Sequence, residues 1–292
     1  MASRFRCLPR RPALENIVIA VQSARMRVEP IDDADDPRIA AFRDIRERDL
    51  VRSGDFIAEG AVVLDHLLTA SLFEPVSILV SEHRIGGLLP RLQALGAEQV
   101  PILVCPQDVM DRLAGFSVHR GILAHGRRRA ERAPDEWLAE TAGPVLAAVG
   151  ISNHDNMGSL FRNAAAFGCA GIVLDETSCD PLYRKAIRVS VGTVLKVPFA
   201  RFASAGAALG RLESAGYSCV ALTPSATVDL AEWTPPDRVA LVVGAEGNGL
   251  PPEVIARCRG LRIEMAPGLD SLNVATSAAI ALHAAFTRRM IR

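Results

Sequence analysis

The sequence has neither the long apolar runs of a membrane protein nor the clustered thiols of a disulfide-rich or zinc-binding protein. Its apolar stretches fall well short of the roughly 18 residues that span a bilayer. The six cysteines are scattered and form no C-x-x-C pair, whereas zinc sites and disulfide frameworks need clustered or regularly spaced thiols. We therefore expect a cytoplasmic protein with reduced cysteines, no membrane partner and no metal.

An excess of either charge is also missing, since 33 Lys and Arg residues balance 33 Asp and Glu residues. A protein that coats nucleic acid non-specifically usually has a basic excess. Any polyanionic partner must therefore be bound by a local patch. The chain has 292 residues, of which 49% are hydrophobic. This composition excludes disorder and a collagen-like fibre, and it suffices for one large or two ordinary domains.

The first half of the chain alternates between strand and helix patterns. Strands are expected at 55–59, 76–80, 100–104 and 121–124, and helices at 61–70, 85–95 and 107–113. This alternation predicts parallel pairing in a layered α/β fold. Residues 126–134 (GRRRAERAP) then break the pattern, because they are charged, lack apolar periodicity and end in proline. They indicate either a solvated linker or a basic stretch that touches phosphates.

These breaks divide the chain into four predicted segments. They are a loose extension at 1–25, a first domain at 26–130, a linker at 131–143 and a second domain at 144–292. The extension has several arginines ahead of a short apolar stretch, Ile17–Val21. That stretch is shorter than the ~7–15 residues of a signal-peptide core, so we do not interpret it as one.

The second half shows the same alternation. Strands are expected at 144–150, 171–174, 218–222, 239–243 and 261–265, and helices at 157–167, 205–214, 251–258 and from 271 onward. A basic segment, Tyr183–Arg201, carries five Lys and Arg residues and no acidic one.

Three polar clusters follow predicted strands, at the strand ends where open α/β sheets bind ligands. The first is Asn153–Gly168 (NHDNMGSLFRNAAAFG). Asn156 is expected at the helix N-cap, and Arg162 lies among apolar neighbours within the helix. Taken alone, an arginine at this position is more often a surface residue whose stem covers apolar groups. The adjacent His154 and Asp155 are a weak candidate for an acid–base pair.

The second cluster, Val243–Pro251 (VGAEGNGLP), holds three glycines that let a ligand approach the backbone closely. It matches neither the P-loop order nor the dinucleotide fingerprint, and Glu246 would repel phosphate. The third cluster comprises residues 263–280, in which Ser271 and Asn273 open a very apolar helix. Alone, these two residues are explained by capping as well as by a site.

Together, the order and spacing of the clusters resemble the three signature motifs of the SpoU (TrmH-type) RNA 2′-O-ribose methyltransferases, within the SPOUT superfamily. The resemblance covers residues 144–290. The matching positions are Asn156, Gly158, Arg162 and Gly168, then Gly244, Glu246, Gly249 and Leu250, and finally Ser271, Leu272 and Asn273. Upstream, residues 56–60 (FIAEG) and 119–124 (HRGILA) resemble a ribosomal-protein-like substrate-recruiting domain. One departure is Glu264, where the family usually has proline.

The resemblance implies an α/β protein whose C-terminal methyltransferase domain forms a deep trefoil knot, from about Val239 to the last helix. The small α/β domain before it would bind the RNA substrate. The implied cofactor is S-adenosylmethionine, and the implied assembly is a homodimer with the active site across the interface. The cofactor-binding residues would be Val243, Gly244, Glu246, Gly249, Ile263, Met265, Leu272 and Asn273, and the catalytic set would be Arg162, Asn156, Glu246, Ser271 and Asn273.

Within this family the arginine matched by Arg162 is the proposed catalytic residue. A guanidinium is a poor base because its pKa exceeds ~12. We therefore expect Arg162 to hold the phosphate next to the reacting ribose and to stabilise developing oxyanion charge. The tRNA or rRNA substrate would also meet basic residues elsewhere, namely Arg127, Arg128, Arg129, Arg184, Lys185 and Arg188.

Two other functions compete with this interpretation. A catalytically silent RNA-binding protein on the same scaffold would be marked by loss of Arg162 or Asn273, and both are present. A nucleotide-dependent oxidoreductase is disfavoured because the dinucleotide fingerprint is missing.

Overall fold

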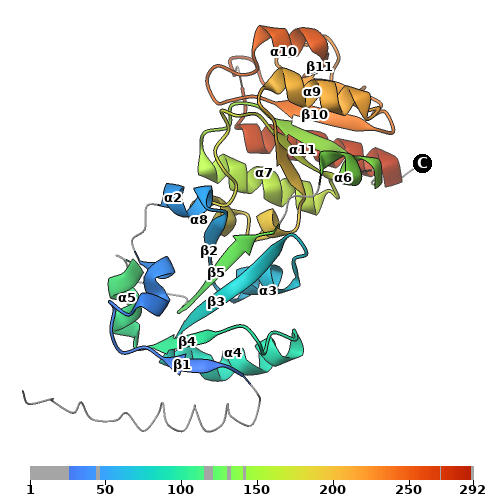
Figure 1. Ribbon diagram of the computed structural model, residues 1–292. Helices are drawn as coiled ribbons and strands as arrows, with labels where there is room; N and C mark the ends of the chain where they lie inside the picture. Colours follow the sequence, from blue (N-terminus) through green and yellow to red (C-terminus); the bar gives the residue numbers. More distant parts are fainter. Residues whose placement is uncertain are drawn as a thin grey trace, which may run out of the picture.

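The computed structural model describes residues 26–43, 47–114, 121–129, 133–140, 143–269 and 271–290. The extension predicted at 1–25 lies outside this part of the chain. Two β-sheets follow each other along the sequence, each with its own helices (Figure 1).

The first sheet is mixed rather than parallel. Its strand order is β1-β4-β3-β5-β2, with β1 Val28–Pro30, β2 Asp55–Glu59, β3 Phe73–Ser81, β4 Ile102–Cys105 and β5 Ile122–Arg128. Strands β1, β4 and β3 are parallel, but β5 runs antiparallel to both β3 and β2. The expectation of parallel pairing throughout is therefore wrong here, because alternation of helices and strands does not fix the direction of each strand.

Strand β5 also continues into the charged stretch 126–134, where the apolar pattern breaks. Gly126 and Arg127 pair with β2, and Arg128 pairs with β3. A Cβ on Gly126 would lie 2.4 Å from the Phe56 ring, so the aromatic ring occupies the space beside this glycine. The sequence did not predict this end of the strand, because its last residues, Arg127 and Arg128, are charged and do not continue the apolar pattern.

Helices cover both faces of the first sheet. These elements are η1 Pro37–Phe42, α2 Glu47–Arg52, α3 Ala61–Thr69, α4 Glu82–Ala94 and α5 Gln107–Ala114. Ile78 and Val80 on β3 point into the apolar cluster that contains α3 and α4, whereas Leu79 points into the cluster with η1 and α5. This alternation is the two-residue period of a strand that is buried on both faces.

The second sheet is parallel throughout, as expected. Its order is β11-β9-β10-β6-β7-β8, with β6 Val145–Ala148, β7 Gly171–Leu174, β8 Phe199–Arg201, β9 Ser218–Leu222, β10 Val239–Val243 and β11 Arg259–Leu261. The strand predicted at 261–265 is wrong, since β11 ends at Leu261. Its partner β9 ends at Leu222, so residues 263–265 have no strand beside them.

Seven helical segments accompany this sheet within the described residues. They are α6 Pro134–Glu140, α7 His154–Ala166, α8 Arg184–Val189, η2 Thr193–Leu195, α9 Ala205–Ser214, α10 Pro252–Arg257 and α11 Val274–Met290. Helices α7 and α11 pack on one face, and α6, α9 and α10 pack on the other. No helix in the described part of the chain is both long and apolar enough to cross a bilayer.

Helix α6 lies inside the segment that we expected to be a linker. Its Trp137 is buried in the same apolar cluster as the inner residues of α9 and α10. A Cβ on Gly171 would lie 2.5 Å from the indole, so strand β7 has a glycine where the ring packs. The segment 134–140 therefore packs as a layer of the second sheet.

The two halves touch through α8 and η2. The Arg184 backbone N–H donates to the carboxylate of Glu47 on α2. The Arg128 guanidinium lies 5.1 Å from the centre of the Phe199 ring, and Gly192 packs against Val63 of α3. The basic segment predicted from the sequence thus contributes to the contact between the halves.

Candidate active site

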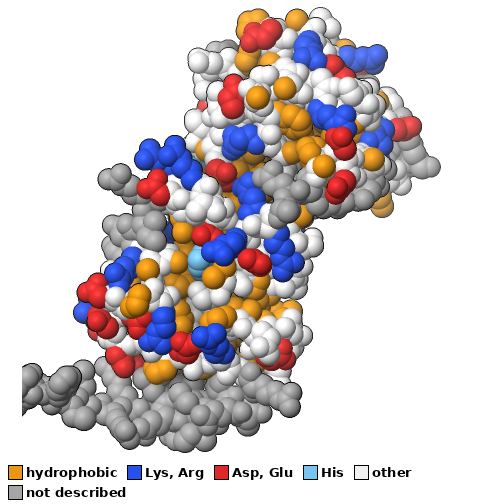
Figure 2. All heavy atoms as spheres, in the orientation of Figure 1, with side chains coloured by type: hydrophobic (Ala, Val, Ile, Leu, Met, Phe, Trp, Pro, Cys, Tyr) orange, Lys and Arg blue, Asp and Glu red, His pale blue; other side chains and the backbone are white. Residues whose placement is uncertain are grey.

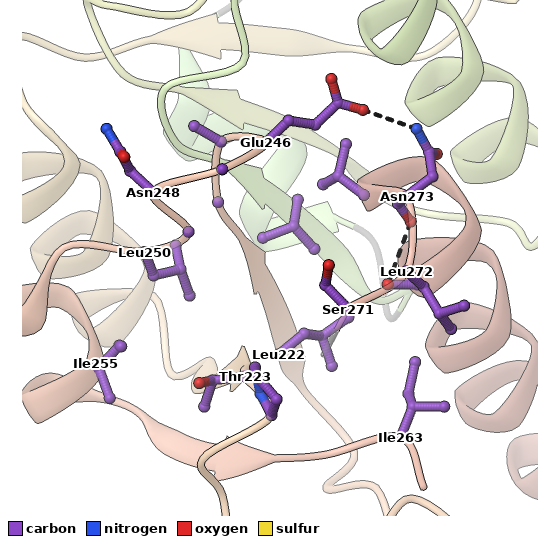
Figure 3. A pocket seen from close by; sticks show the side chains of 18 of the residues that line it. Leu222, Thr223, Glu246, Asn248, Leu250, Ile255, Ile263, Ser271, Leu272 and Asn273 are labelled. Carbon is purple, nitrogen blue, oxygen red and sulfur yellow. Dashed lines mark hydrogen bonds between the residues drawn. The ribbon is translucent and has the colours of Figure 1, made fainter. Parts of the chain in front are cut away.

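A cavity of about 590 Å³ opens where strands β9, β10 and β11 end (Figure 3). Its walls come from the residues after β9, from the loop after β10 and from the segment between β11 and α11. Because all strands of this sheet are parallel, their carboxyl ends gather these loops at one edge. The volume falls in the range of small-molecule sites, ~300–1,000 Å³.

The glycine-rich loop after β10 folds tightly onto itself. The Gly249 N–H donates to the Ala245 carbonyl at 3.0 Å, and Gly247 and Gly249 have φ of 90° and 66°. A Cβ on Gly244 would lie 2.4 Å from the carbonyl carbon of Gly249, so no other residue fits at this position. Residues 246–249 are exposed at the cavity, which leaves their backbone accessible to a ligand.

One amide joins the three sequence clusters. Asn273 Nδ2 donates to Asn156 Oδ1 at 2.9 Å and to Glu246 Oε1 at 2.8 Å. Figure 3 shows Glu246 and Asn273 pointing toward each other at the cavity rim. Asn273 Oδ1 accepts the backbone N–H groups of Ala275 and Thr276, which fixes the amide at the start of α11. Each amide atom is thus used, and the side chain has one orientation.

The helix caps differ from the prediction. Asn153, not Asn156, caps α7, because its Oδ1 accepts the Asp155 N–H at 2.8 Å. Asn156 is buried in the first turn, where it meets Asn273 instead. Two asparagines three residues apart both suit a cap, so spacing alone did not separate the capping residue from the site residue. Helix α11 likewise begins at Val274, after the polar residues.

Among the predicted catalytic residues, Arg162 stands apart. Asn156, Glu246 and Asn273 are joined by hydrogen bonds, and Ser271 lines the same cavity. Arg162 is exposed on α7, does not line the cavity and has no polar partner among the described residues. It lies six residues beyond Asn156, which is about 9 Å along a helix axis.

The weak acid–base candidate is not a pair. The His154 ring packs on the Tyr183 ring, with centroids 4.5 Å apart, whereas the Asp155 carboxylate binds Lys185 Nζ at 2.7 Å. The two side chains therefore serve the contact between α7 and α8.

The eight residues predicted to bind the cofactor all line the cavity. They are Val243, Gly244, Glu246, Gly249, Ile263, Met265, Leu272 and Asn273. Sequence reasoning missed a third wall, made by Leu222, Thr223 and Pro224 after β9. The parallel neighbour of β10 supplies this wall, so the available signal was strand adjacency, which the sequence alone does not give.

A buried carboxylate supports the floor of the site. Asp175 Oδ1 accepts the Gly150 N–H at 3.0 Å and the Ser178 hydroxyl at 2.6 Å. Burial raises the pKa of Asp175, but the hydrogen bonds from Ser178, Thr177 and the backbone outweigh burial, and the net pKa is lowered. A Cβ on Gly150 would lie 3.3 Å from the Cβ of Ala245, so this anchor lies directly beneath the glycine-rich loop.

The arginines at 127–129 that were predicted to contact RNA, two at the end of β5 and one directly after it, each face a carboxylate. The nearest atoms are 2.7 Å apart for Arg127 and Asp55, 3.6 Å for Arg128 and Asp180, and 3.9 Å for Arg129 and Glu74. These acids come from other elements and were invisible to a reading of the local charge pattern. Much of the positive charge on this strand is therefore balanced in the fold.

The three predicted RNA-binding residues of α8 differ among themselves. Arg184 lies 4.0 Å from Glu59, and Lys185 binds Asp155. Arg188 is exposed, with no ion-pair or hydrogen-bond partner in the part of the chain that the structure describes.

Comparison with known proteins gives a consistent result. The model of the SpoU rRNA Methylase family matches residues 143–283. A protein of Mycobacterium tuberculosis, named as an uncharacterized tRNA/rRNA methyltransferase, is 39% identical over 272 residues, which are 88% of this chain and 91% of that protein. The 23S rRNA (guanosine-2′-O-)-methyltransferase RlmB of Vibrio vulnificus is 28% identical over 214 residues, 72% of this chain and 85% of that protein.

A solved structure has the same fold over nearly its whole length. The AdoMet-bound rRNA methyltransferase from Sinorhizobium meliloti matches with a TM-score of 0.78 and 23% identity, covering 91% of this chain and 99% of that one. Both sheets therefore belong to an arrangement that another chain shares.

Proposed function

Because this chain belongs to the SpoU methylase family of RNA methyltransferases, we propose that it transfers a methyl group from S-adenosylmethionine to a ribose 2′-hydroxyl of rRNA or tRNA. The family expected from the three motifs is confirmed. The name of the RlmB relative supports the 2′-hydroxyl as acceptor. The observation that carries the proposal is the hydrogen-bonded trio of Asn156, Glu246 and Asn273 at the rim of a glycine-lined cavity.

The cavity fits an adenosine-based cofactor. Gly244 leaves no room for a side chain where the loop closes, and the exposed backbone at 246–249 offers N–H and C=O groups to a base and a ribose. Ile263, Met265 and Leu272 supply apolar walls, and Leu272 is exposed until something covers it. When bound, S-adenosylmethionine supplies an electrophilic methyl group and its own leaving group.

The protein's part in the reaction is positioning and charge stabilisation. Asn273 is held at the rim by Asn156 and Glu246, and Ser271 stands next to it with its hydroxyl at the cavity. Arg162, which carries no partner in the described chain, holds the phosphate beside the target ribose and stabilises the oxygen as it loses its proton. A guanidinium can do both because it binds phosphate through two parallel N–H groups and keeps its charge.

We further propose a homodimer with the site at the interface, and a trefoil knot from about Val239 to α11. The position of Arg162 outside its own cavity supports the dimer, because a partner subunit can bring a cavity to it. Helix α11 also presents Ile280 and Phe286, which are 38% and 39% exposed. Such apolar side chains on a terminal helix are suited to an interface.

Calorimetry and methyl transfer test the proposal together. The protein should bind S-adenosylmethionine and not NAD, and it should transfer a radiolabelled methyl group to rRNA or tRNA from cells that lack it. Mapping of ribose methylation in RNA from cells with and without the protein identifies the nucleotide. Cofactor binding without any transfer would favour the catalytically silent RNA-binding protein, and NAD binding would favour the oxidoreductase.

A further inference from the structure

Helices α2 and α8 form a basic surface to which both halves of the chain contribute. We call the surface of Arg48, Arg52, Tyr183, Lys185 and Arg188 the junction patch. Figure 2 shows Lys and Arg side chains gathered over these two helices, which Figure 1 places side by side. The Arg184 N–H bond to Glu47 holds the two helices together, so the patch has a fixed shape.

The charges of the patch are not equally available. Lys185 binds Asp155 at 2.7 Å, and Arg48 lies 3.6 Å from Asp49. Arg52 and Arg188 are exposed and have no hydrogen-bond or ion-pair partner among the residues that the structure describes. One comes from each half of the chain. These two guanidiniums are therefore free to bind an anion.

An aromatic ring lies among these cations. Tyr183 is partly exposed, and its ring packs on His154. Burial and the carboxylates of Glu47 and Asp180 raise the pKa of the Tyr183 phenol, and the positive charges of Arg48 and Arg52 oppose that rise, so charges of both signs lie within electrostatic reach of the ring. The chain has only two tyrosines, and the other, Tyr217, is buried at 4% exposure. Tyr183 is thus the one tyrosine that a ligand can reach.

The patch is connected to the candidate active site by a single helical turn. His154, on which Tyr183 packs, is the first residue of α7. Asn156, two residues later, binds Asn273 at the cavity rim. The two side chains lie on different sides of a helix about 10–12 Å in diameter. The rim and the patch are therefore separated by about the width of one helix.

We propose that the junction patch binds an unpaired segment of RNA beside the methylated nucleotide, with a base against Tyr183 and phosphates on Arg52 and Arg188. This inference rests on the proposed function. Unpaired bases stack on aromatic side chains, whereas the bases of an RNA duplex are hidden in its stack and its deep groove. A single partly exposed ring on a small basic surface suits a single strand. A duplex would need a wider basic surface, and the chain has no net positive charge.

Binding of a fluorescein-labelled single-stranded RNA dodecamer, and of its duplex, to the full chain tests the proposal. Tyr183→Leu should weaken single-strand binding by about 5- to 150-fold, the range for loss of one stacked base. Tyr183→Phe keeps the ring and should bind within about twofold of the original chain. Arg52→Ala and Arg188→Ala should each flatten the salt dependence by about 0.7 in log–log slope, whereas Tyr183→Leu should leave the slope unchanged.

Arg112→Ala is the control for loss of an exposed arginine away from the patch, because Arg112 on α5 is 62% exposed and pairs with Asp108 at 3.3 Å. Equal loss in Arg112→Ala and Arg188→Ala would overturn the inference, as would tighter binding of the duplex or no binding up to about 100 μM RNA. Unchanged binding in Tyr183→Leu would also overturn it. Cofactor binding and methyl transfer are measured on the same samples. If the original chain neither binds the cofactor nor transfers a methyl group, the proposed function is wrong. If it transfers the methyl group normally but the patch substitutions leave RNA binding unchanged, only the junction patch is wrong.

Discussion

The two sheets of this protein are built from similar pieces but differ in strand direction, and this difference locates the site. In the second sheet all strands are parallel, so the loops after β9, β10 and β11 gather at one edge around a cavity. In the first sheet β5 is antiparallel to both neighbours, and its arginines face carboxylates of the fold. The arginines of β5 are therefore largely balanced by carboxylates of the fold, whereas the second sheet leaves polar groups directed at a ligand.

The largest effect expected from this difference concerns Arg162, a cation of the second half that has no polar partner among the described residues. Arg162→Ala should lower kcat by about 10²–10³-fold, as loss of an oxyanion-stabilising group does, with little change in cofactor affinity. Arg162→Lys should rescue little, because lysine cannot reproduce two parallel hydrogen bonds to phosphate. Single-turnover methylation and calorimetry on the folded protein measure both quantities. Near-normal turnover in Arg162→Ala would show that Arg162 is an ordinary surface residue without a catalytic role.

The next largest effect is expected when one glycine in each half is replaced by alanine and the cofactor affinities of the two variants are compared. Gly244→Ala places a Cβ 2.4 Å from the Gly249 carbonyl carbon, so the loop must move. We expect cofactor affinity to fall by about 5- to 150-fold, corresponding to overpacking of ~1–3 kcal/mol. The control Gly87→Ala lies in helix α4, where a Cβ meets nothing within 4 Å. It should leave the affinity unchanged and raise stability by about 0.5–1 kcal/mol. Equal cofactor affinity in the two variants would remove the glycine-rich loop from the site.

The sequence predicted the regular parts of the fold and the contents of the site, but not the connections between them. Strand β2 at Asp55–Glu59 and helix α9 at Ala205–Ser214 were predicted within about a residue, because apolar period and turn residues agree there. The cavity residues of the second and third clusters were also predicted, because the order and spacing of the clusters resemble the family's motifs. These signals are local.

The features that the sequence did not predict depend on contacts between residues far apart in the chain. The direction of β5 and the end of β11 are set by partner strands, and the burial of Trp137 in the expected linker is set by Gly171. The choice of Asn153 over Asn156 as helix cap depends on Asn273, more than a hundred residues away. The local sequence pattern holds no information on such distant contacts, so it could not distinguish the capping Asn153 from the site residue Asn156.

An effect of intermediate size is expected when a carboxylate is neutralised in each half, Asp175 in the second and Asp55 in the first. The lowered pKa of Asp175 means that its carboxylate stabilises the fold above the unfolded-state pKa of ~3.9, and that this contribution is lost as pH falls through the lower folded-state pKa. Asp175→Asn should therefore cost about 1–3 kcal/mol at pH 7, and the cost should shrink below about pH 4. Urea unfolding at both pH values measures it.

The control for Asp175 is Asp55→Asn in the first sheet, which removes the partner of Arg127. Both variants should lose stability, but only Asp175→Asn should weaken cofactor binding, because Asp175 holds Gly150 beneath the glycine-rich loop. A cofactor affinity lowered equally by Asp55→Asn would show that stability rather than position determines binding.

The smallest expected effect compares two exposed arginines, one from each of the predicted RNA-binding sets. Arg129 is 54% exposed and lies 3.9 Å from Glu74, whereas Arg188 has no partner in the described chain. Releasing Arg129 from a surface pair costs at most about 1 kcal/mol, so such a pairing does not by itself forbid RNA binding. However, RNA must then compete with Glu74, and repulsion from that carboxylate offsets the gain. We expect Arg129→Ala to change single-strand RNA affinity by less than about twofold and to leave the salt slope unchanged, whereas Arg188→Ala lowers the slope by about 0.7. A slope that falls equally in both variants would show that the substrate runs along β5 as well, and the RNA surface would then extend from the junction patch across the first sheet.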